Sequence, residues 1–232
     1  MTLVRRASVA LMVALLALLS LGLAAGKADA APEAAVGGGT AIVFGGKYGC
    51  TMTAVGHDRG GRLVGLTAAH CAKGGHYNVS LRNNRAAGVI GRVSVLSKGG
   101  DFAVVTLDRN KVRPVRSVGP ARIVGVGRFP AFGTTVCKMG ATTGFTCGPV
   151  LQEGQARSTG YVCAASGDSG APVLRGNRVV GMLNGGQYVG GMAIQCPFGG
   201  FPIHSPMVAT KMTQILASLN RHGRVGAGFR VI

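Results

Sequence analysis

Three short stretches of the sequence carry side chains that together can activate a nucleophile. "LTAAHC" contains His70, "GGDFAVV" contains Asp101 and "SGDSGA" contains Ser169. A serine hydroxyl is a poor nucleophile at neutral pH, so an imidazole must take its proton and return it to the leaving group. A shielded carboxylate must fix the imidazole tautomer and stabilise its charged form. We therefore predict that Ser169 is a nucleophile, His70 its general base and Asp101 the acid that orients His70.

The glycines around Ser169 favour a backbone that can stabilise negative charge. Gly167 and Gly170 flank the Asp168-Ser169 pair, and glycine makes a sharp turn accessible. In such a turn the N–H groups of Gly167 and Ser169 converge on a developing oxyanion. These two N–H groups are the expected oxyanion hole.

Two other acids compete with Asp101 for the orienting role. Asp58 lies in "HDRGG" and Asp108 in "LDRN", and both stretches resemble exposed turns. Asp101 instead leads directly into the apolar "FAVVTL", which would shield it. We favour Asp101, although each of the three motifs taken alone also fits a turn acid, a packed histidine or a surface serine.

The elements that must position these residues are short strands. Hydrophobic residues make up 47% of the chain and charged residues 14%, which excludes a disordered protein. Clusters of glycine, asparagine or lysine separate β-prone stretches at the spacing of barrels or sandwiches. A stretch with two prolines at 112–122 divides the stretches into two halves, and two small antiparallel barrels would leave no exposed sheet edge. The expected strands are 41–44, 50–55, 62–68, 76–82, 87–96, 102–107, 134–138, 150–156, 160–163, 171–174, 178–184 and 191–196.

A helical period first appears near the end of the chain, in "PMVATKMTQILASLN". Apolar residues recur there at steps of three and four, and proline stands at a first-turn position. We expect one C-terminal helix against a sheet, followed by a frayed basic tail at 223–232.

The first 30 residues have the pattern of a secretory signal peptide. Arg5 and Arg6 precede an apolar run that ends at Ala25, and Ala28-Asp29-Ala30 has the form of a cleavage site. The alternative is an uncleaved membrane anchor, because the apolar run is just long enough to span a bilayer. We favour cleavage and a secreted or extracytoplasmic protein.

Export changes the expected state of the cysteines. All six lie after the signal, and an even count in an oxidising compartment predicts three disulfides, although six cysteines allow about 15 pairings. The sequence has no Cys-x-x-Cys pair and no close Cys/His cluster, so we expect no metal.

The formal net charge of +18 favours contact with anionic polymers or cell surfaces. The basic residues are scattered, however, and the chain has no nucleic-acid motif and no tryptophan. An exported protein with a cationic surface is therefore favoured over a specific nucleic-acid binder.

In this arrangement the sequence resembles the chymotrypsin-like serine proteases, in particular the compact bacterial streptogrisins and α-lytic protease. The resemblance covers about residues 36–218 and rests mainly on "LTAAHC" and "GDSGAPV" in this order, with weaker support from "VGGGTAI", "GGDFAVV", "CKMGATTGFTCG", "VVGMLNGG" and the late Cys196. It implies an all-β fold of two six-stranded antiparallel β-barrels, and a monomeric endopeptidase that works through an acyl-enzyme without a cofactor.

The resemblance also implies partners for buried groups. The disulfides would be Cys50–Cys71, Cys137–Cys147 and Cys163–Cys196. In this family a cation neutralises the buried acid before the nucleophile, here Asp168. The bacterial branch has arginine where this chain has Lys138, so we expect a Lys138–Asp168 pair, with the α-amino group of Val36 as the lesser alternative.

Two positions depart from the family's pattern. Asn184 stands where a serine usually bonds the catalytic aspartate, and its amide can still donate. Ala171 replaces the usual glycine after "GDSG" and requires a negative φ. Only a few residues separate Ala30 from "VGGG", and the Ala35-Val36 junction has no basic residue for tryptic activation.

Substrate would add as a strand along residues 184–186. The expected substrate-binding residues are Ala164, Ala165, Ser166, Leu183, Asn184, Gly185 and Gly186. No acid precedes Cys163, and Phe201 and Pro202 would narrow the base of the pocket, so we expect small or medium apolar residues before the cleaved bond.

The expected organisation is a signal peptide (1–30), a short segment (31–35), an N-terminal barrel (36–115), a C-terminal barrel with helix (116–219) and a basic tail (220–232). Two other functions remain open. One is a catalytically silent relative that binds anionic surfaces, and the other is a purely structural disulfide-braced barrel.

Overall fold

The protein is described by a computed structural model for residues 33–75, 77–188 and 190–232. The expected signal peptide and residues 31 and 32 lie outside this part. Within it, most strands belong to two large sheets of eight and seven strands, and none of its helices has the length and apolarity needed to cross a membrane.

The first sheet closes on itself through a bent segment of chain. Its spatial order is β19 (Arg230–Val231), β4 (Ala54–His57), β5 (Leu63–Thr67), β8 (Phe102–Leu107), β7 (Val89–Ser97), β6 (Asn78–Leu81), β2 (Ala41–Phe44) and β3 (Tyr48–Thr51). Met52 and Thr53 alone separate β3 from β4, so nearly continuous chain joins the two sides of the sheet. Their N–H groups donate to Thr40 and Leu66, on opposite sides of the bend. Ile42, Met52 and Leu66 are fully buried inside.

The second sheet closes by strand pairing. Its order is β12 (Gly125–Val126), β17 (Arg178–Gly186), β16 (Pro172–Arg175), β13 (Thr135–Gly140), β14 (Gly144–Glu153), β15 (Arg157–Gly160) and β18 (Met207–Lys211). β17 also pairs with β18, which completes a six-stranded barrel with β12 added at its edge. Buried apolar side chains fill it, Val136, Val150, Val173 and Met207 among them.

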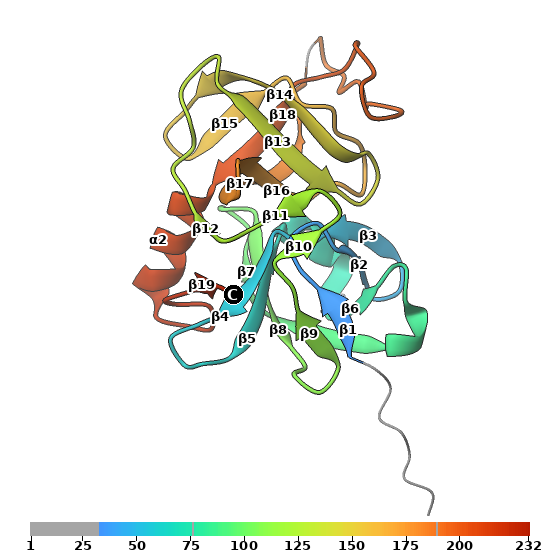
Figure 1. The fold of residues 1–232 in the computed structure, drawn as a ribbon, viewed down its shortest axis with the longest axis vertical. Coiled ribbons are helices and arrows are strands. Elements are labelled where there is room, and N and C mark those ends of the chain that lie inside the picture. The colour runs from blue at the N-terminus through green and yellow to red at the C-terminus, as the bar shows by residue number, and fades with distance from the viewer. Residues whose placement is uncertain (1–32, 76, 189) are drawn as a thin grey trace, which may run out of the picture. The chain divides into compact units, whose positions relative to one another are not determined.

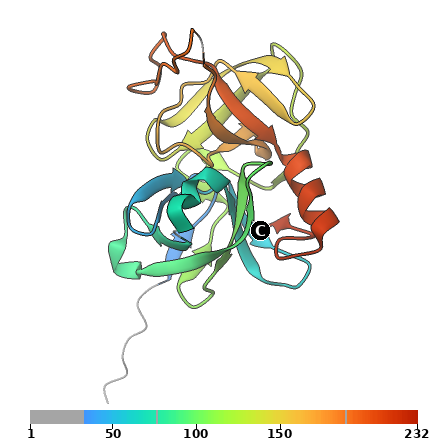
Figure 2. The same ribbon diagram turned by 180° about the vertical axis from the view of Figure 1, so that it is seen from behind.

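Short elements complete the fold (Figures 1 and 2). β1 (Ala34–Val36) runs parallel to β9 (Val112–Pro114), and β10 (Ser117–Val118) pairs with β11 (Ala121–Arg122). The strands within 112–122 therefore belong to neither large sheet. The 3₁₀-helices are η2 (Ala69–Gly75) and η3 (Arg85–Ala87), and the helix after β18 is α2 (Met212–His222). The prediction of an all-β double barrel with a C-terminal helix is confirmed.

Two predicted elements were wrong. Residues 191–196 form no strand, and the expected helix begins six residues later than proline suggested, because 207–211 form β18. In β18 Met207 and Ala209 are buried, and the strand bonds to β15 and β17 on its two sides. Closure of the barrel therefore overrides the helical period.

The predicted frayed tail is also folded. β19 pairs with β4, and Ala227 and Phe229 are buried. Asp58, which the sequence placed in an exposed turn, is buried. Its carboxylate accepts hydrogen bonds from the N–H of Gly226 and from the guanidinium of Arg62. Burial of the Asp58 carboxyl raises its pKa, but these hydrogen bonds outweigh burial and lower it overall.

The contact between β4 and β19 provides a test of the folded tail. A Cβ at Gly56 would overlap the carbonyl group of Arg230, whereas a Cβ at Gly49, in β3, meets open space. We expect Gly56→Ala to lower the free energy of unfolding by about 1–3 kcal/mol and to expose the Ile232 amide, which donates to the Val55 carbonyl, to hydrogen exchange. Gly49→Ala is the control and should leave this protection intact. Equal protection in both variants would contradict the pairing.

Candidate active site

His70 and Asp101 lie at the same end of two neighbouring strands. β5 leads into η2, which carries His70, and β8 begins one residue after Asp101, while Thr67 of β5 pairs with Ala103 of β8. His70 Nδ1 lies 2.9 Å from Asp101 Oδ2 and 3.0 Å from Oδ1. The backbone N–H of His70 also donates to Oδ1, at 3.0 Å. The carboxylate thus fixes both the ring and the backbone of the histidine.

Asn184 holds the other side of the Asp101 carboxylate. Its Nδ2 donates to Oδ2 at 2.7 Å and to the carbonyl oxygen of Asp101 at 3.0 Å. Its Oδ1 accepts hydrogen bonds from the N–H and hydroxyl of Thr210, at 2.8 and 2.7 Å. Burial alone raises the pKa of the Asp101 carboxyl. The hydrogen bonds from His70, the charge interaction with His70 and the hydrogen bond from Asn184 outweigh burial and lower the pKa overall. Asp101 therefore remains a carboxylate at neutral pH.

The backbone of Asp101 adopts an uncommon conformation. Its φ of 48° is the only positive φ of a non-glycine residue in the described part of the chain. Aspartate tolerates this region better than most residues, although it still carries strain. The bonds to His70 and Asn184 hold the residue there.

The Ser169 loop is fastened to the bend between β3 and β4. The Thr51 N–H donates to the carbonyl of Ser169 at 2.8 Å, and the Thr53 hydroxyl donates to that of Gly170 at 2.6 Å. The disulfide Cys50–Cys71 ties β3, just before this bend, to η2. The fold thereby brings the loop that carries Ser169 to the helix that carries the histidine. The Ser169 side chain itself makes no hydrogen bond with any described residue.

Two N–H groups of this loop are free for a ligand. Within the described chain those of Gly167 and Ser169 have no acceptor, whereas those of Asp168, Gly170 and Ala171 bond to backbone carbonyls. Gly167 has φ +98°, and a Cβ there would strike the Thr142 hydroxyl, so glycine is required. Ala171 is not among the residues with positive φ.

Asp168 is fully buried, and its carboxylate is surrounded by donors. These are the N–H groups of Thr142 (2.8 Å), Thr143 (3.1 Å) and Ala165 (3.1 Å) and the hydroxyl of Thr143 (2.6 Å). Lys138 Nζ lies 3.3 Å from Oδ2 and also donates to the Thr143 hydroxyl and to the Gly144 carbonyl. Burial lowers the pKa of Lys138, and the negative charge of Asp168 opposes that shift.

The alternative cation, the α-amino group of Val36, does not reach Asp168 here. Val36 lies within β1 with the chain continuing on its N-terminal side, so its nitrogen is a neutral amide. The other two disulfides are Cys137–Cys147, across β13 and β14, and Cys163–Cys196, which braces the segment before Ser169. All three pairs are those that the resemblance implied.

A small pocket of about 120 Å³ opens beside Ser169. Six of the seven expected substrate-binding residues line it, and Asn184 instead turns toward Asp101. Sequence reasoning missed Ala193, Ile194 and Gln195, because residues 191–196 were expected to form a strand, and it also missed Ser205. Phe201 and Pro202 line a different hollow, with Tyr161 and His204, and so the expectation that they narrow this pocket was wrong.

The edge of β17 beside this pocket is open. The β16–β17 ladder ends at Pro172 and Met182, so Gly185 and Gly186 pair on one side only, with β18. Asn184 lies at a bulge in the ladder with β18. An extended peptide can add to the other side.

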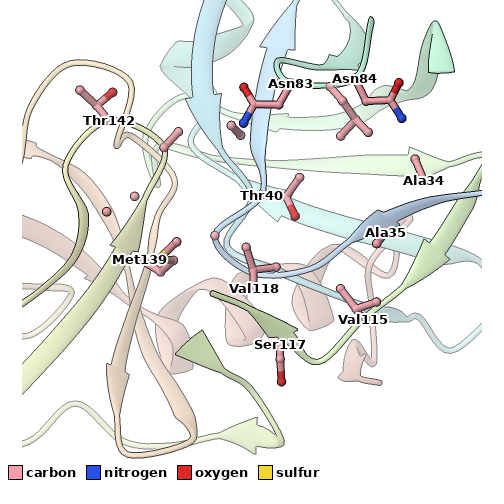
Figure 3. A pocket seen from close by; sticks show the side chains of 16 residues that line it. Ala34, Ala35, Thr40, Asn83, Asn84, Val115, Ser117, Val118, Met139 and Thr142 are labelled. Atoms are coloured by element: carbon pink, nitrogen blue, oxygen red, sulfur yellow. The ribbon is translucent and has the colours of Figure 1, made fainter. Parts of the chain in front are cut away.

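A further hollow, of about 570 Å³, is lined by apolar and neutral polar residues (Figure 3). Apolar residues such as Val118 and Met139 line it together with Thr40, Asn83 and Thr142, and no titratable side chain does.

Comparison with known proteins agrees with the geometry. Residues 52–204 match the family described as Trypsin. A search of curated protein sequences found no match. Similar solved structures include Nocardiopsis protease (24% identity, 80% of this chain and 96% of that one, TM-score 0.63), Thermobifida fusca protease A (23%, 86% and 99%, 0.65) and Cellulomonas bogoriensis chymotrypsin (25%, 86% and 99%, 0.60).

The family match spans about two thirds of the chain, and it includes both the histidine and the serine motifs. The chain belongs to the trypsin family and is a serine endopeptidase with the chymotrypsin-like double barrel.

Proposed function

We propose that the chain hydrolyses peptide bonds with Ser169 as nucleophile, His70 as general base and acid, and Asp101 as the residue that orients His70. Ser169 Oγ attacks the peptide carbonyl carbon while His70 Nε2 takes its proton. The imidazolium returns the proton to the leaving amine, which departs and leaves an acyl-enzyme. Water then gives a proton to His70 and attacks the ester carbonyl carbon. The imidazolium returns this proton to Ser169 Oγ as the ester C–O bond breaks, and the carboxylic acid product leaves.

The hydrogen-bonded chain from Thr210 through Asn184 and Asp101 to His70 is the observation that carries this proposal. Each group in this chain has its hydrogen-bond partners, so the His70 imidazole keeps its proton on Nδ1 and leaves Nε2 as a proton acceptor. Among the described residues no group bonds to the Ser169 hydroxyl, so none competes with His70 for it. The hydrogen bond between a catalytic serine and its histidine is often long in enzymes without substrate. The N–H groups of Gly167 and Ser169 would receive the oxyanion.

The pocket beside Ser169 supports a preference for small apolar residues before the cleaved bond. Its volume is only about 120 Å³, and alanine, leucine and isoleucine side chains form much of its wall. No charged side chain lines it. Alanine or valine fits such a space, whereas an aromatic or a lysine side chain does not.

The disulfides support export of the enzyme to an oxidising compartment. Three bridges account for all six cysteines, and such bridges are rare in the cytosol. The signal-peptide pattern at 1–30 gives the route.

Covalent labelling tests the nucleophile directly. We expect a fluorophosphonate probe to label the exported, disulfide-bonded protein at Ser169, since only an activated serine reacts quickly. Ser169→Ala should abolish labelling, and His70→Ala should slow it by several orders of magnitude, read by in-gel fluorescence and mass spectrometry. Folded wild-type protein that stays unlabelled would refute the proposal.

Asn184 should act as a positioning residue for the Asp101 carboxylate. We expect Asn184→Ala to lower kcat by about 10- to 100-fold, the value of a hydrogen bond to a charged group. Asn184→Ser should restore part of the loss, because a hydroxyl can still donate to Asp101.

The loss of the Asn184 donor should also raise the pKa of Asp101. Because the wild-type value is lowered, the stability that this carboxylate provides is present above its ordinary pKa of 3.8 and is lost as pH falls through the folded value. In Asn184→Ala the folded pKa lies closer to the ordinary value, so this carboxylate should contribute less stability and its acid loss should be complete at a higher pH.

Lys138 should be essential to the fold of the Ser169 loop. We expect Lys138→Met to lower the free energy of unfolding by about 3–5 kcal/mol, since it leaves Asp168 buried without a cation. Lys211→Met is the matched control, because Lys211 pairs with the half-exposed Glu153 and its loss should cost at most about 1 kcal/mol. Urea unfolding curves for both variants measure the difference, and similar losses would contradict the role of the buried pair.

A further inference from the structure

A second hollow lies against the catalytic histidine. It has a volume of about 500 Å³ and lies between η2 and the segment that joins β7 to β8. His70 and Asp101 form part of its wall, together with Lys73, Lys98, Tyr77 and Leu96. It shares no lining residue with the pocket beside Ser169, so it is a separate space.

The position of this hollow fits one particular residue of a bound substrate. A peptide that adds to the free edge of β17 is extended, and successive side chains of an extended strand point to opposite sides. When one side chain enters the pocket beside Ser169, the preceding one faces away from that pocket. The space next to His70 is where such a side chain can go.

The charges in the hollow are predominantly positive. Lys73 comes from η2 and Lys98 from the segment after β7, and both are exposed. Within the described chain neither ammonium group has a hydrogen bond or an ion pair. The one carboxylate in the wall, Asp101, is already bonded to His70 and Asn184. Two cations from different elements therefore line the same space, and the one carboxylate there is bonded to other groups.

The remaining wall suits the stem of a side chain. Leu96 is half-buried and Tyr77 is 38% exposed, so each offers apolar surface to a methylene group. A carboxylate on a short aliphatic stem would satisfy both parts of the hollow, whereas a lysine or arginine would meet like charge.

We propose that Lys73 and Lys98 form a cationic subsite that selects Asp or Glu as the substrate residue immediately before the one held beside Ser169. The subsite rests on the proposed function, because it reads a side chain of the same bound peptide. It makes the enzyme selective for an acidic residue followed by a small apolar one. The attraction is between partly exposed charges, so it weakens as salt concentration rises.

Matched peptide substrates test the subsite. Three chromogenic peptides would carry alanine before the cleaved bond and glutamate, glutamine or lysine before that alanine. We expect kcat/KM for glutamate to exceed that for the isosteric glutamine by about three- to tenfold at low salt, with lysine below both. The glutamate-to-glutamine ratio should fall toward one at high salt.

Lysine variants locate the effect. Lys73→Gln and Lys98→Gln should each lower the glutamate-to-glutamine ratio, and the double variant should bring it close to one. Arg175→Gln is the charge-matched control, because Arg175 is exposed at the end of β16 remote from Ser169 and lines none of the hollows described above. It should keep the wild-type ratio.

The outcomes separate this inference from the proposed function. A wild-type enzyme that is labelled at Ser169 and cleaves the glutamine peptide, but shows no preference for glutamate, would overturn the subsite and leave the triad intact. A preference for glutamate that persists in the double lysine variant would also overturn it. So would a preference that depends on the lysines only in peptides whose glutamate follows the cleaved bond. Failure of labelling would instead refute the triad.

Discussion

The negative charge of Asp168 sets the structure of the nucleophile loop. A fully buried carboxylate costs several kcal/mol unless it is paired and hydrogen-bonded, and here five donors surround it. To provide them, the turn after β13 must aim consecutive N–H groups at one point. Gly140 must lack a side chain, because a Cβ would occupy the place of the carboxylate. The same constraint fixes the residues on both sides of Asp168, and it leaves the N–H groups of Gly167 and Ser169 without an acceptor among the residues that the structure describes.

A second constraint aligns this loop with the histidine. The bend at 51–53 belongs to the first sheet, yet its backbone and hydroxyl groups bond to Ser169 and Gly170. Thr67, just before η2, donates its hydroxyl to the carbonyl of Thr51. The same few residues therefore close the first sheet, anchor the nucleophile loop and position the segment that leads to His70. A change at the bend would disturb all three together.

The scarcity of acids gives each one a structural consequence. The chain has seven acidic and 25 basic residues, and Asp58, Asp101 and Asp168 are all used in internal hydrogen bonds. Little negative charge remains to balance the surface. Lys73 and Lys98, in the wall of the hollow beside His70, therefore keep their charge available for a substrate. In our proposal, substrate selection thus depends on the acids being bonded inside the fold rather than to surface lysines.

The sequence by itself determined the class of fold and predicted the chemistry. "LTAAHC" and "GDSGAPV" predict the general base and the nucleophile because catalysis demands those residue types within local turns, and the strand pattern predicts two barrels because it follows from short-range alternation. Only the tertiary structure decided that Met207–Lys211 is a strand, that the last residues fold back on β4, and that Ala193, Ile194 and Gln195 complete the pocket. The same is true of the Thr210–Asn184–Asp101 hydrogen bonds and of the placement of Lys73 and Lys98 in the wall of one hollow. These features join residues far apart in the chain, and barrel closure, which no local pattern encodes, determines which of them meet.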